Sequence, residues 1–393
     1  MLIQNKTIAI VGGGPGGLTL ARLLQLKGAT AKVYERDLNA SVRVQGATLD
    51  LHEDSGLAAL IKAGLMDAFS ANFRPGADRM RIVDNQATIH FDDHEGKPKA
   101  DFDDAFFRPE IDRGPLRKIL LESLKPDTVV WDSQFLSMTT FENGWKLNFQ
   151  NGTTATANIV IGADGANSKI RPFITAVKPL YSGVTMVEGT IYDSKNNSPK
   201  IHELLKGGKI FAFGGEKTLI VSSKGNGEMS FYTGVKTDES WVHESGLDFK
   251  NKTQLLAWFK KEFLEWDSIW WELFQHDKTY FIPRPQYCML LDQTWQALPN
   301  ITMLGDAAHV MPPFAGEGVN MAMQDALELS ECITDDKFES IQTAITFYET
   351  QMRTRASEAT NNTLSSMENM HSKDGLKFML EMFSRDFSPI ENK

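Results

Sequence analysis

The sequence predicts an α/β protein in which a parallel sheet is interrupted by a second, mainly β domain. A short apolar strand over 6–11 ends abruptly in glycines and leads into a helix and a second strand. Strand-like segments with glycine-rich turns occupy about 178–284, and a short apolar strand returns at 301–304. We therefore expect a first domain in two parts, 1–177 and 285–337, around an inserted domain at 178–284, followed by a C-terminal bridging helix and tail at 338–393.

The elements of the first domain follow from the spacing of apolar residues. Leu18–Leu26 has helical spacing and Gly28 ends it, after which Thr30–Tyr34 predicts a strand. Further along we expect a helix at 56–69, a hairpin across 80–91, a helix at 115–124, and strands from 128 to 163 with Asn-Gly turns. Helices are expected at 319–333 and from 340 to about 370, and the second is predicted to clamp the two domains together.

The composition excludes several classes of protein. The 393 residues hold 41 Lys and Arg against 51 Asp and Glu, a net charge of −10, which disfavours nucleic acid and anionic membranes as partners. Two cysteines exclude a disulfide scaffold, and no apolar run reaches the ~20 residues that span a bilayer. The eight histidines lack metal-ligand spacing. We expect a cytoplasmic monomer that acts on small molecules without a metal.

The glycine-rich segment after the first strand is the clearest motif. Gly12, Gly14 and Gly17 satisfy G-x-G-x-x-G, with Pro15 at the start of the helix. Such glycines permit a tight turn, close approach of a pyrophosphate and close helix–strand packing, and the helix N-terminus attracts phosphates. Glu35 stands 23 residues after Gly12, at the end of the second strand, where an acid binds the ribose of an adenosine. A Rossmann-like dinucleotide site is predicted.

Two further segments combine a strand end with an acidic residue. Gly305-Asp306 ends the strand at 301–304 and is followed by the loop of Gly316 and Gly318, which opens onto a helix N-terminus. Taken alone, Asp306 is more often an N-cap for the next turn. Asp164, in Gly162-Ala163-Asp164-Gly165, similarly fits a simple Asx-turn.

These three motifs, in this order and spacing, resemble the class A flavin monooxygenases of the aromatic hydroxylase type. The chain is similar in particular to the tetracycline-inactivating monooxygenases, over 33–37, 46–52, 109–113 and 303–320. The resemblance runs from about residue 7 to residue 352. It implies a glutathione-reductase-like FAD-binding domain with an inserted β-sheet substrate domain and a long C-terminal helix.

The resemblance also assigns roles to matching residues. Glu35 and Arg36 would hold the adenosine ribose and phosphate region, Arg43 would meet NADPH, and Asp164 would support both flavin and nicotinamide binding. Asp50, Arg113 and Asp306 would contact FAD. The isoalloxazine would be lined by Pro313, Phe314, Gly316, Gly318 and Asn320, with Phe314 facing substrate.

The implied reaction is hydroxylation of a polycyclic or phenolic small molecule, with a tetracycline-class antibiotic as one candidate. NADPH reduces FAD, O₂ adds to form the flavin C4a-hydroperoxide, and its distal oxygen passes to the substrate, so no side-chain nucleophile is expected. The alternatives are a flavin-dependent oxidoreductase or dehydrogenase of the same fold that inserts no oxygen, and a non-catalytic binding protein. The intact flavin motifs argue against the latter.

Three positions depart from the tetracycline-binding pattern. Where that family has Gln, Arg and His, this chain has Glu188, Lys209 and Ser230. Lys keeps the charge of Arg but loses its planar fork, and an ionised Glu accepts hydrogen bonds without donating them. Glu188 and Lys209 could instead pair with each other. The Trp-rich segment 255–274 offers an aromatic platform, but we predict that it packs in a domain core.

Overall fold

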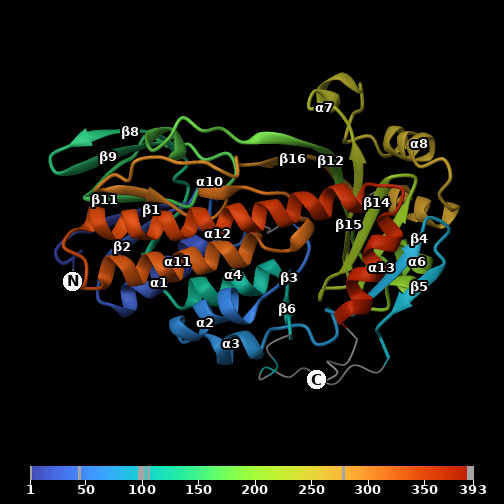
Figure 1. Ribbon diagram of the computed structural model, residues 1–393, viewed down its shortest axis with the longest axis horizontal. Coiled ribbons are helices and arrows are strands. Elements are labelled where there is room, and N and C mark those ends of the chain that lie inside the picture. Colours follow the sequence, from blue (N-terminus) through green and yellow to red (C-terminus); the bar gives the residue numbers. More distant parts are fainter. Residues whose placement is uncertain are drawn as a thin grey trace.

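The computed structural model describes residues 2–42, 46–95, 102, 104, 107–276 and 279–386. A parallel sheet with its helices lies at one end of the molecule and a larger sheet at the other (Figure 1). The parallel sheet has the order β17–β11–β1–β2–β7, with strands Ile301–Met303, Ile159–Gly162, Thr7–Val11, Thr30–Tyr34 and Val129–Val130. Since every pair in it is parallel, the strands end at a common edge.

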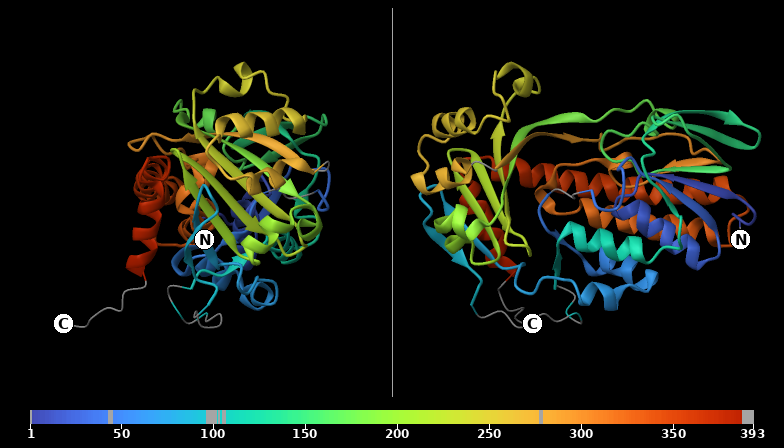
Figure 2. Two further views of the ribbon diagram at one scale, coloured as in Figure 1. Left: turned by 90° about the vertical axis from the view of Figure 1, so that its right-hand side faces the viewer. Right: turned by 180° about the vertical axis from the view of Figure 1, so that it is seen from behind.

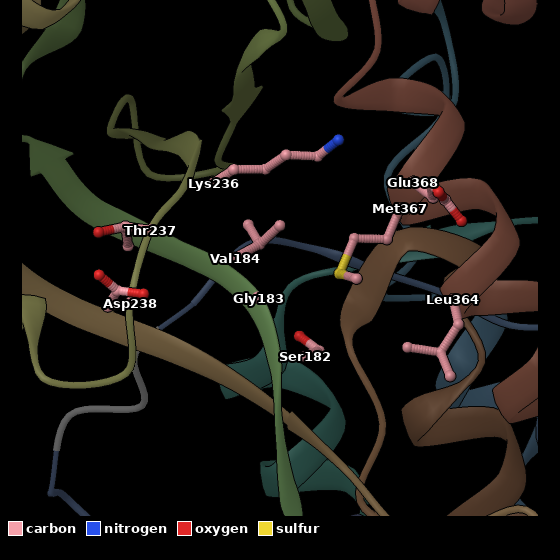
Figure 3. A pocket seen from close by; sticks show the side chains of 9 residues that line it. All are labelled: Ser182, Gly183, Val184, Lys236, Thr237, Asp238, Leu364, Met367 and Glu368. Carbon is pink, nitrogen blue, oxygen red and sulfur yellow. The ribbon is translucent and has the colours of Figure 1, made fainter.

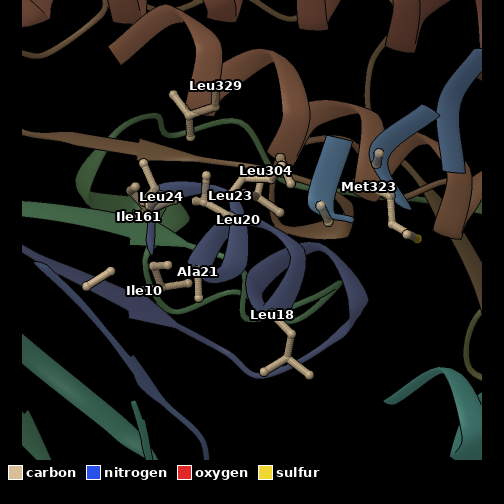
Figure 4. Close-up of a cluster of buried hydrophobic side chains, with 14 of the residues drawn as sticks. Ile10, Leu18, Leu20, Ala21, Leu23, Leu24, Ile161, Leu304, Met323 and Leu329 are labelled. Carbon is tan, nitrogen blue, oxygen red and sulfur yellow. The ribbon is translucent and has the colours of Figure 1, made fainter. Parts of the chain in front are cut away.

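The β1–α1–β2 unit forms as predicted. Helix α1 (Pro15–Leu26) starts with a proline in its first turn, a position where the missing N–H costs nothing. Its leucines are buried against the sheet and against α11 (Gly318–Thr334), where Leu20 and Leu23 approach Leu304 and Leu329 (Figure 4). This packing fixes the start of α1 at the edge where β1 ends.

Smaller elements complete this domain. A meander of β8 (Phe135–Phe141), β9 (Gly144–Phe149) and β10 (Thr154–Ala157) packs against the parallel sheet. β3 (Leu49–Asp50) pairs with β6 (Glu110–Ile111). The helical segments are η1 (Glu53–Leu57), α2 (Ala58–Ala63), α3 (Met66–Ser70), α4 (Arg113–Glu122), η2 (Arg171–Phe173), α10 (Asp306–His309) and η4 (Pro313–Ala315).

The second sheet has seven strands, and two of them come from the first domain's expected range. Its order is β16–β12–β15–β14–β13–β4–β5, with strands Tyr280–Cys288, Leu180–Ile191, Met229–Lys236, Lys217–Ser223, Lys209–Gly214, Met80–Asp84 and Ile89–Asp92. The hairpin across 80–91 exists, but β4 pairs with β13, more than 120 residues away. The expected ranges 1–177 and 178–284 therefore need correction, because this long-range pairing leaves no local signature and β16 runs on to Cys288.

Helices cover the outer face of the seven-stranded sheet. They are α5 (Ser194–Asn197), α6 (Pro199–Leu205), α7 (Trp241–Glu244), α8 (Lys252–Glu262), η3 (Ser268–Trp271) and α9 (Glu272–Gln275). Trp266 and Trp270 are buried in the cluster that they form with the sheet. The prediction that this Trp-rich segment packs a domain core is confirmed.

Helix α12 (Ile341–Met370) joins the two parts, as predicted. It runs along the molecule from the parallel sheet to the seven-stranded one (Figures 1 and 2). Its first half, including Tyr348 and Met352, is buried in the core of the parallel-sheet domain, whereas Met367 packs against Val184 and Met186 of β12. Helix α13 (Gly375–Asp386) then packs on β13 and β4. Among the described residues, none of these helices is both long and apolar enough to cross a membrane.

Candidate functional site

The glycine turn after β1 leaves almost no room for side chains. A Cβ on Gly12, whose φ is +112°, would lie 2.2 Å from the carbonyl oxygen of Ala163, and one on Gly17 would lie 2.1 Å from that of Gly12. Gly14 differs, because its backbone is extended and no protein atom lies within 4 Å of its Cβ position. The turn thus leaves open space beside Gly14, where Pro15 begins α1.

Glu35 is held next to this turn. Its buried carboxylate accepts the N–H of Gly13 at 2.5 Å and the N–H of Asp37 at 3.0 Å. The strand-end position predicted for this acid is confirmed by the pairing of β2 with β1. Arg36 is exposed, and Arg43 lies outside the described residues.

Asp164 and Arg171 build the second loop at this edge. Oδ2 of Asp164 accepts the N–H groups of Lys169 (2.7 Å) and Ile170 (3.3 Å), five and six residues further on, so it closes a wider loop than the Asx-turn, which bonds two residues on. Its Oδ1 is buried and has no hydrogen-bond partner among the described residues. The buried Arg171 guanidinium donates to the carbonyls of Ala307 (2.7 Å) and Asp306 (3.0 Å). It therefore ties the Asp164 loop to the Asp306 segment.

Asp306 begins α10 beside Gly305, which adopts φ +59° and ψ −147°, a conformation that suits glycine alone. The side chain is exposed, yet the protein around it raises the pKa of the carboxyl, an effect that His309, Arg113 and Arg171 partly offset. The Asp306 carboxyl is thus reached by solvent although protein atoms surround much of it.

Asn320 connects the start of α11 to β3. Its amide donates to the carbonyl oxygen of Asp50 (3.0 Å), and its Oδ1 accepts the N–H of His52 (2.9 Å). The side chain is fully buried, so it positions these segments rather than offering free donors to a ligand. Asp50 itself approaches Gly316, where a Cβ would lie 3.4 Å from a carboxylate oxygen.

The Asp50 carboxylate stays ionised. Burial favours the neutral form, but the His52 ring at 3.1 Å and the charge of Lys209 lower the pKa to about 2. Glu317, next to Gly316 and Gly318, lies 3.8 Å from His52, and burial raises its pKa. Acidic groups therefore surround the loop that precedes α11.

Arg113 and Tyr232 hold the same residue from two domains. Arg113 Nε donates to the carbonyl oxygen of Ala47 (3.0 Å), and the N–H of Ala47 donates to the hydroxyl of Tyr232 on β15 (2.9 Å). The pKa of Tyr232 rises to about 12, chiefly through burial and the nearby Glu188 carboxylate. The seven-stranded sheet is thus bonded to the loop that follows residues 43–45.

Phe314 brings the turn before α11 into contact with the second sheet. Like Ile220 and Tyr232, it packs against the buried cluster of Val184, Met186 and Met367, whereas Pro313 beside it is exposed. The Phe314 ring also meets the buried His371 ring edge-on, 5.2 Å between centroids. The position where Phe314 is expected to face substrate therefore lies at the boundary between the parallel-sheet domain and the seven-stranded sheet. We call this boundary the seam.

The three positions that depart from the tetracycline-binding pattern, Glu188, Lys209 and Ser230, share one face of the second sheet. The ion pair between Glu188 and Lys209 that the sequence allowed does not form. Glu188 bonds Arg284 at 2.9 Å, and Lys209 makes an ion pair with Glu110 of β6. Ser230 is buried, and its Oγ has no hydrogen-bond partner within the described part of the chain. Pairing between Glu188 and Lys209 is wrong because each has a nearer partner on another strand.

Two cavities lie along the seam. One, of about 620 Å³, lies between the start of β12 and the end of α12, where Met367 points toward Val184 and Lys236 extends past them (Figure 3). The other, of about 510 Å³, lies beside Arg113 at the start of α4 and reaches Gly46 and the turn at Gly225. Within the described ranges, no cluster of His, Cys, Asp and Glu suited to a metal ion is found.

The arrangement suits a flavin adenine dinucleotide. The open space at Gly14 admits a pyrophosphate at the N-terminus of α1, and Glu35 lies beside it for a ribose. Oδ1 of Asp164, which lacks a partner among the described residues, and the exposed carboxyl of Asp306 can accept hydroxyl groups further along the same edge. The edge therefore offers the kinds of donors and acceptors that FAD requires.

Comparison with known proteins identifies the class. The FAD binding domain family matches residues 5–363, so the chain belongs to this family. Monooxygenase asqM of Emericella nidulans is 29% identical over 383 residues, covering 84% of each chain. The protein is a class A flavin-dependent monooxygenase.

Two solved structures share the fold. Klebsiella pneumoniae HpxO in complex with FAD and uric acid superposes with a TM-score of 0.75 at 20% identity, over 98% of this chain and 93% of HpxO. Tetracycline destructase Tet(55) gives 0.76 at 17% identity, over 98% and 96%. At these identities the likeness shows the fold alone.

Sequence reasoning missed several residues that shape the site. Arg171, Asp325 and Arg355 support the Gly305-Asp306 segment, and Glu110 and Tyr232 join the two domains. Arg171 lies seven residues after Asp164, so its nearness in the sequence to that acidic residue is a signal that could have found it. Asp325 is completely buried on α11, Arg355 lies on α12, and only the tertiary contact between them reveals their function.

Proposed function

We propose that this monooxygenase takes electrons from NADPH and inserts one oxygen atom of O₂ into a small polycyclic or phenolic substrate. The observation that carries the proposal is the packing of Phe314, on the turn before α11, against the buried cluster that contains Val184 and Met186 of the second sheet. Because this turn is next to Asp50 and the start of α11, a substrate held against the sheet at Phe314 lies beside the flavin-binding edge.

The chain's own residues hold the cofactor and exclude water. The N–H groups at the start of α1 bind the pyrophosphate, Glu35 the ribose, and Asp306 the sugar-alcohol chain. The N-terminus of α11, at Gly318, favours an electron-rich ring through its partial positive charge. FAD, when bound, supplies the electron transfer and the activation of O₂. Apolar packing around Phe314 keeps water from the reacting atoms.

The reductant site is proposed from the resemblance of the sequence. Arg43 and Asp164 would meet NADPH, and Arg36 would lie at the adenosine phosphate. Gly46, three residues after Arg43 in the chain, lines the 510 Å³ cavity together with Arg113, which donates to the carbonyl oxygen of Ala47. Transient binding there fits a chain with one G-x-G-x-x-G unit.

The ion pairs that Glu188 and Lys209 form bear on which substrates the site can bind. Tet(55) is a tetracycline destructase and HpxO was solved with uric acid, so electron-rich ring compounds are the substrates to test first. The three polar side chains at the tetracycline-binding positions differ here in type, and two of them, Glu188 and Lys209, are paired with Arg284 and Glu110. A phenolic or polycyclic compound other than tetracycline is therefore our leading candidate.

The test follows NADPH oxidation by FAD-loaded protein in air, with tetracycline and a panel of phenols, together with peroxide and product. We expect at least one compound to accelerate NADPH oxidation and to gain one oxygen atom from ¹⁸O₂. If NADPH oxidation ends entirely in peroxide with every compound, oxygen insertion is overturned. Oxidation of a compound without O₂, with the flavin bleached, would instead identify a dehydrogenase of the same fold.

A further inference from the structure

The register of the seven-stranded sheet places three polar side chains in one row that faces the flavin-binding domain. Lys209 on β13 pairs with Ser222 on β14, which pairs with Ser230 on β15. Directly paired residues point to the same face, and the ion pair of Lys209 with Glu110 shows which face this is. The next row contains Phe211, Ile220, Tyr232 and Glu188, so the polar row adjoins the apolar surface under Phe314.

Carboxylates outnumber the cation at the centre of this row. Burial opposes the charge of Lys209, but the carboxylates of Glu110, Asp50 and Asp78 outweigh this effect and raise the pKa of the ammonium. Glu110 is almost completely buried, and Asp50 remains ionised. The Lys209 ammonium is already bound by Glu110, and Asp50 is the cross-strand partner of Glu110. Burial raises the pKa of Glu110, and the Lys209 charge opposes this shift. The ammonium group therefore does not serve as a receptor for a further anion.

The other cations along this face are matched as well. Arg284 is bonded to Glu188, and the charge of Arg113 acts on the Asp306 carboxyl. Tyr232, between these groups, keeps its proton because its pKa is about 12. Ser230 Oγ is buried without a partner in the same row as Lys209. A neutral hydroxyl group can satisfy such an atom without adding charge.

We infer that the polar row of Lys209, Ser222 and Ser230 selects neutral or cationic phenols and rejects substrates that carry a carboxylate at this end. The inference rests on the proposed function and names the class of substrate for the same site. Glu110 sets this specificity by neutralising Lys209, and Asp78 and Asp50 supply the excess negative charge. A carboxylate placed here meets like charge in a partly desolvated site, where such a contact costs several-fold to many-fold in affinity.

The experiment compares two ligands that differ by one carboxylate, 2-naphthol and 6-hydroxy-2-naphthoate. Each is titrated into FAD-loaded protein at neutral pH, and the change in flavin absorbance gives the dissociation constant. We expect 6-hydroxy-2-naphthoate to bind about tenfold more weakly than 2-naphthol. Equal or tighter binding of the naphthoate, or no binding of either compound, overturns the inference.

Variants connect the preference to the named residues. Glu110→Gln keeps the shape of the side chain and frees the Lys209 charge, so the ratio of the two dissociation constants should fall about fivefold. Asp78→Asn, at a half-exposed position, should shift the ratio in the same direction by a smaller factor and serves if Glu110→Gln does not fold. Glu122→Gln, an exposed acid at the end of α4, is the matched control and should leave the ratio unchanged.

The binding ratio requires no turnover, so its failure is separate from failure of the proposed function. Much tighter binding of 2-naphthol without any oxygen insertion would overturn the proposed oxygenase activity but support the proposed selection against carboxylates. Oxygen insertion into a carboxylate-bearing phenol, with an unchanged ratio in Glu110→Gln, would keep the oxygenase and overturn the specificity.

Discussion

Nε2 of the buried His309 lies 2.6 Å from Oδ2 of Asp325, and this oxygen also accepts the N–H of Gly305 at 2.9 Å. Arg355 bonds the other Asp325 oxygen at 2.6 Å and makes two contacts with Glu328. Burial opposes both charges, yet the pKa of His309 is raised and that of Asp325 is lowered, so the pair is ionised. The hydrogen bonds of this network reach the Gly305-Asp306 turn and stabilise its unusual backbone conformation.

Asp325→Asn should weaken FAD binding through this turn. The amide removes the charge that holds His309 and Arg355, and breaking a buried pair costs about 3 kcal/mol of stability. FAD affinity is measured by flavin fluorescence, beside urea unfolding of the apoprotein. Glu328→Gln, which removes a partner of Arg355 but does not touch Gly305, is the matched control and should leave FAD affinity unchanged. Equal FAD affinities in both variants would contradict a positioning role for Asp325.

Asp306→Ala should be purified largely colourless. Loss of a charged hydrogen-bond acceptor weakens binding by about 2 kcal/mol, roughly thirtyfold in the dissociation constant of FAD. The ratio of flavin to protein absorbance measures retention, with Asp335→Ala on the exposed loop after α11 as the control. A fully yellow Asp306→Ala protein would rule out this contact.

Gly14→Val should also lose FAD, and without harm to the apoprotein. The extended backbone of Gly14 is a conformation that any residue can adopt, and no atom of the described residues lies within 4 Å of its Cβ position. The added side chain therefore occupies the space expected for the cofactor. Gly12→Val, in contrast, collides with the Ala163 carbonyl and should lower the melting temperature of the apoprotein. Retained FAD in Gly14→Val would show that the pyrophosphate does not approach this backbone.

His371 should make stability fall in acid. Burial, together with the charge of Lys236, lowers its pKa from 6.5 to about 4, although its bond to the Met367 carbonyl opposes the shift. The unfolded chain therefore binds a proton before the folded one does, and this contribution to stability is complete above 6.5 and lost as the pH falls toward 4. The loss amounts to about 3 kcal/mol.

The check is urea unfolding of wild type and His371→Gln at neutral pH and near the folded pKa. The variant should lose less stability on acidification, because Gln does not titrate. A parallel loss in both proteins would assign the acid sensitivity to other groups. His371 also bonds Thr218 and contacts Phe314, so acidification is expected to loosen the seam on which Phe314 lies.

Much of the cofactor edge could be predicted from the sequence. The glycine turn, the acid at the end of β2 and the Gly305-Asp306 strand end all lie where predicted, because each depends on a few neighbouring residues. A turn without room for a Cβ demands glycine, and an apolar strand that ends in an acid needs no distant partner to be recognised. The long helix at 340–370 was equally plain from its spacing.

The tertiary structure alone decided which side chains meet. Lys209 and Glu110 are 99 residues apart, Arg171 and Asp306 are 135 apart, and β4 joins β13 across the chain. No local pattern encodes such pairs, since any of the 51 acidic residues could have faced Lys209. The class of protein could therefore be predicted from short motifs, because these motifs depend on local backbone geometry. The charge of the proposed substrate-binding face arose only when the packing of two domains placed the Glu110 carboxylate against the Lys209 ammonium group, with Asp50 beside Glu110.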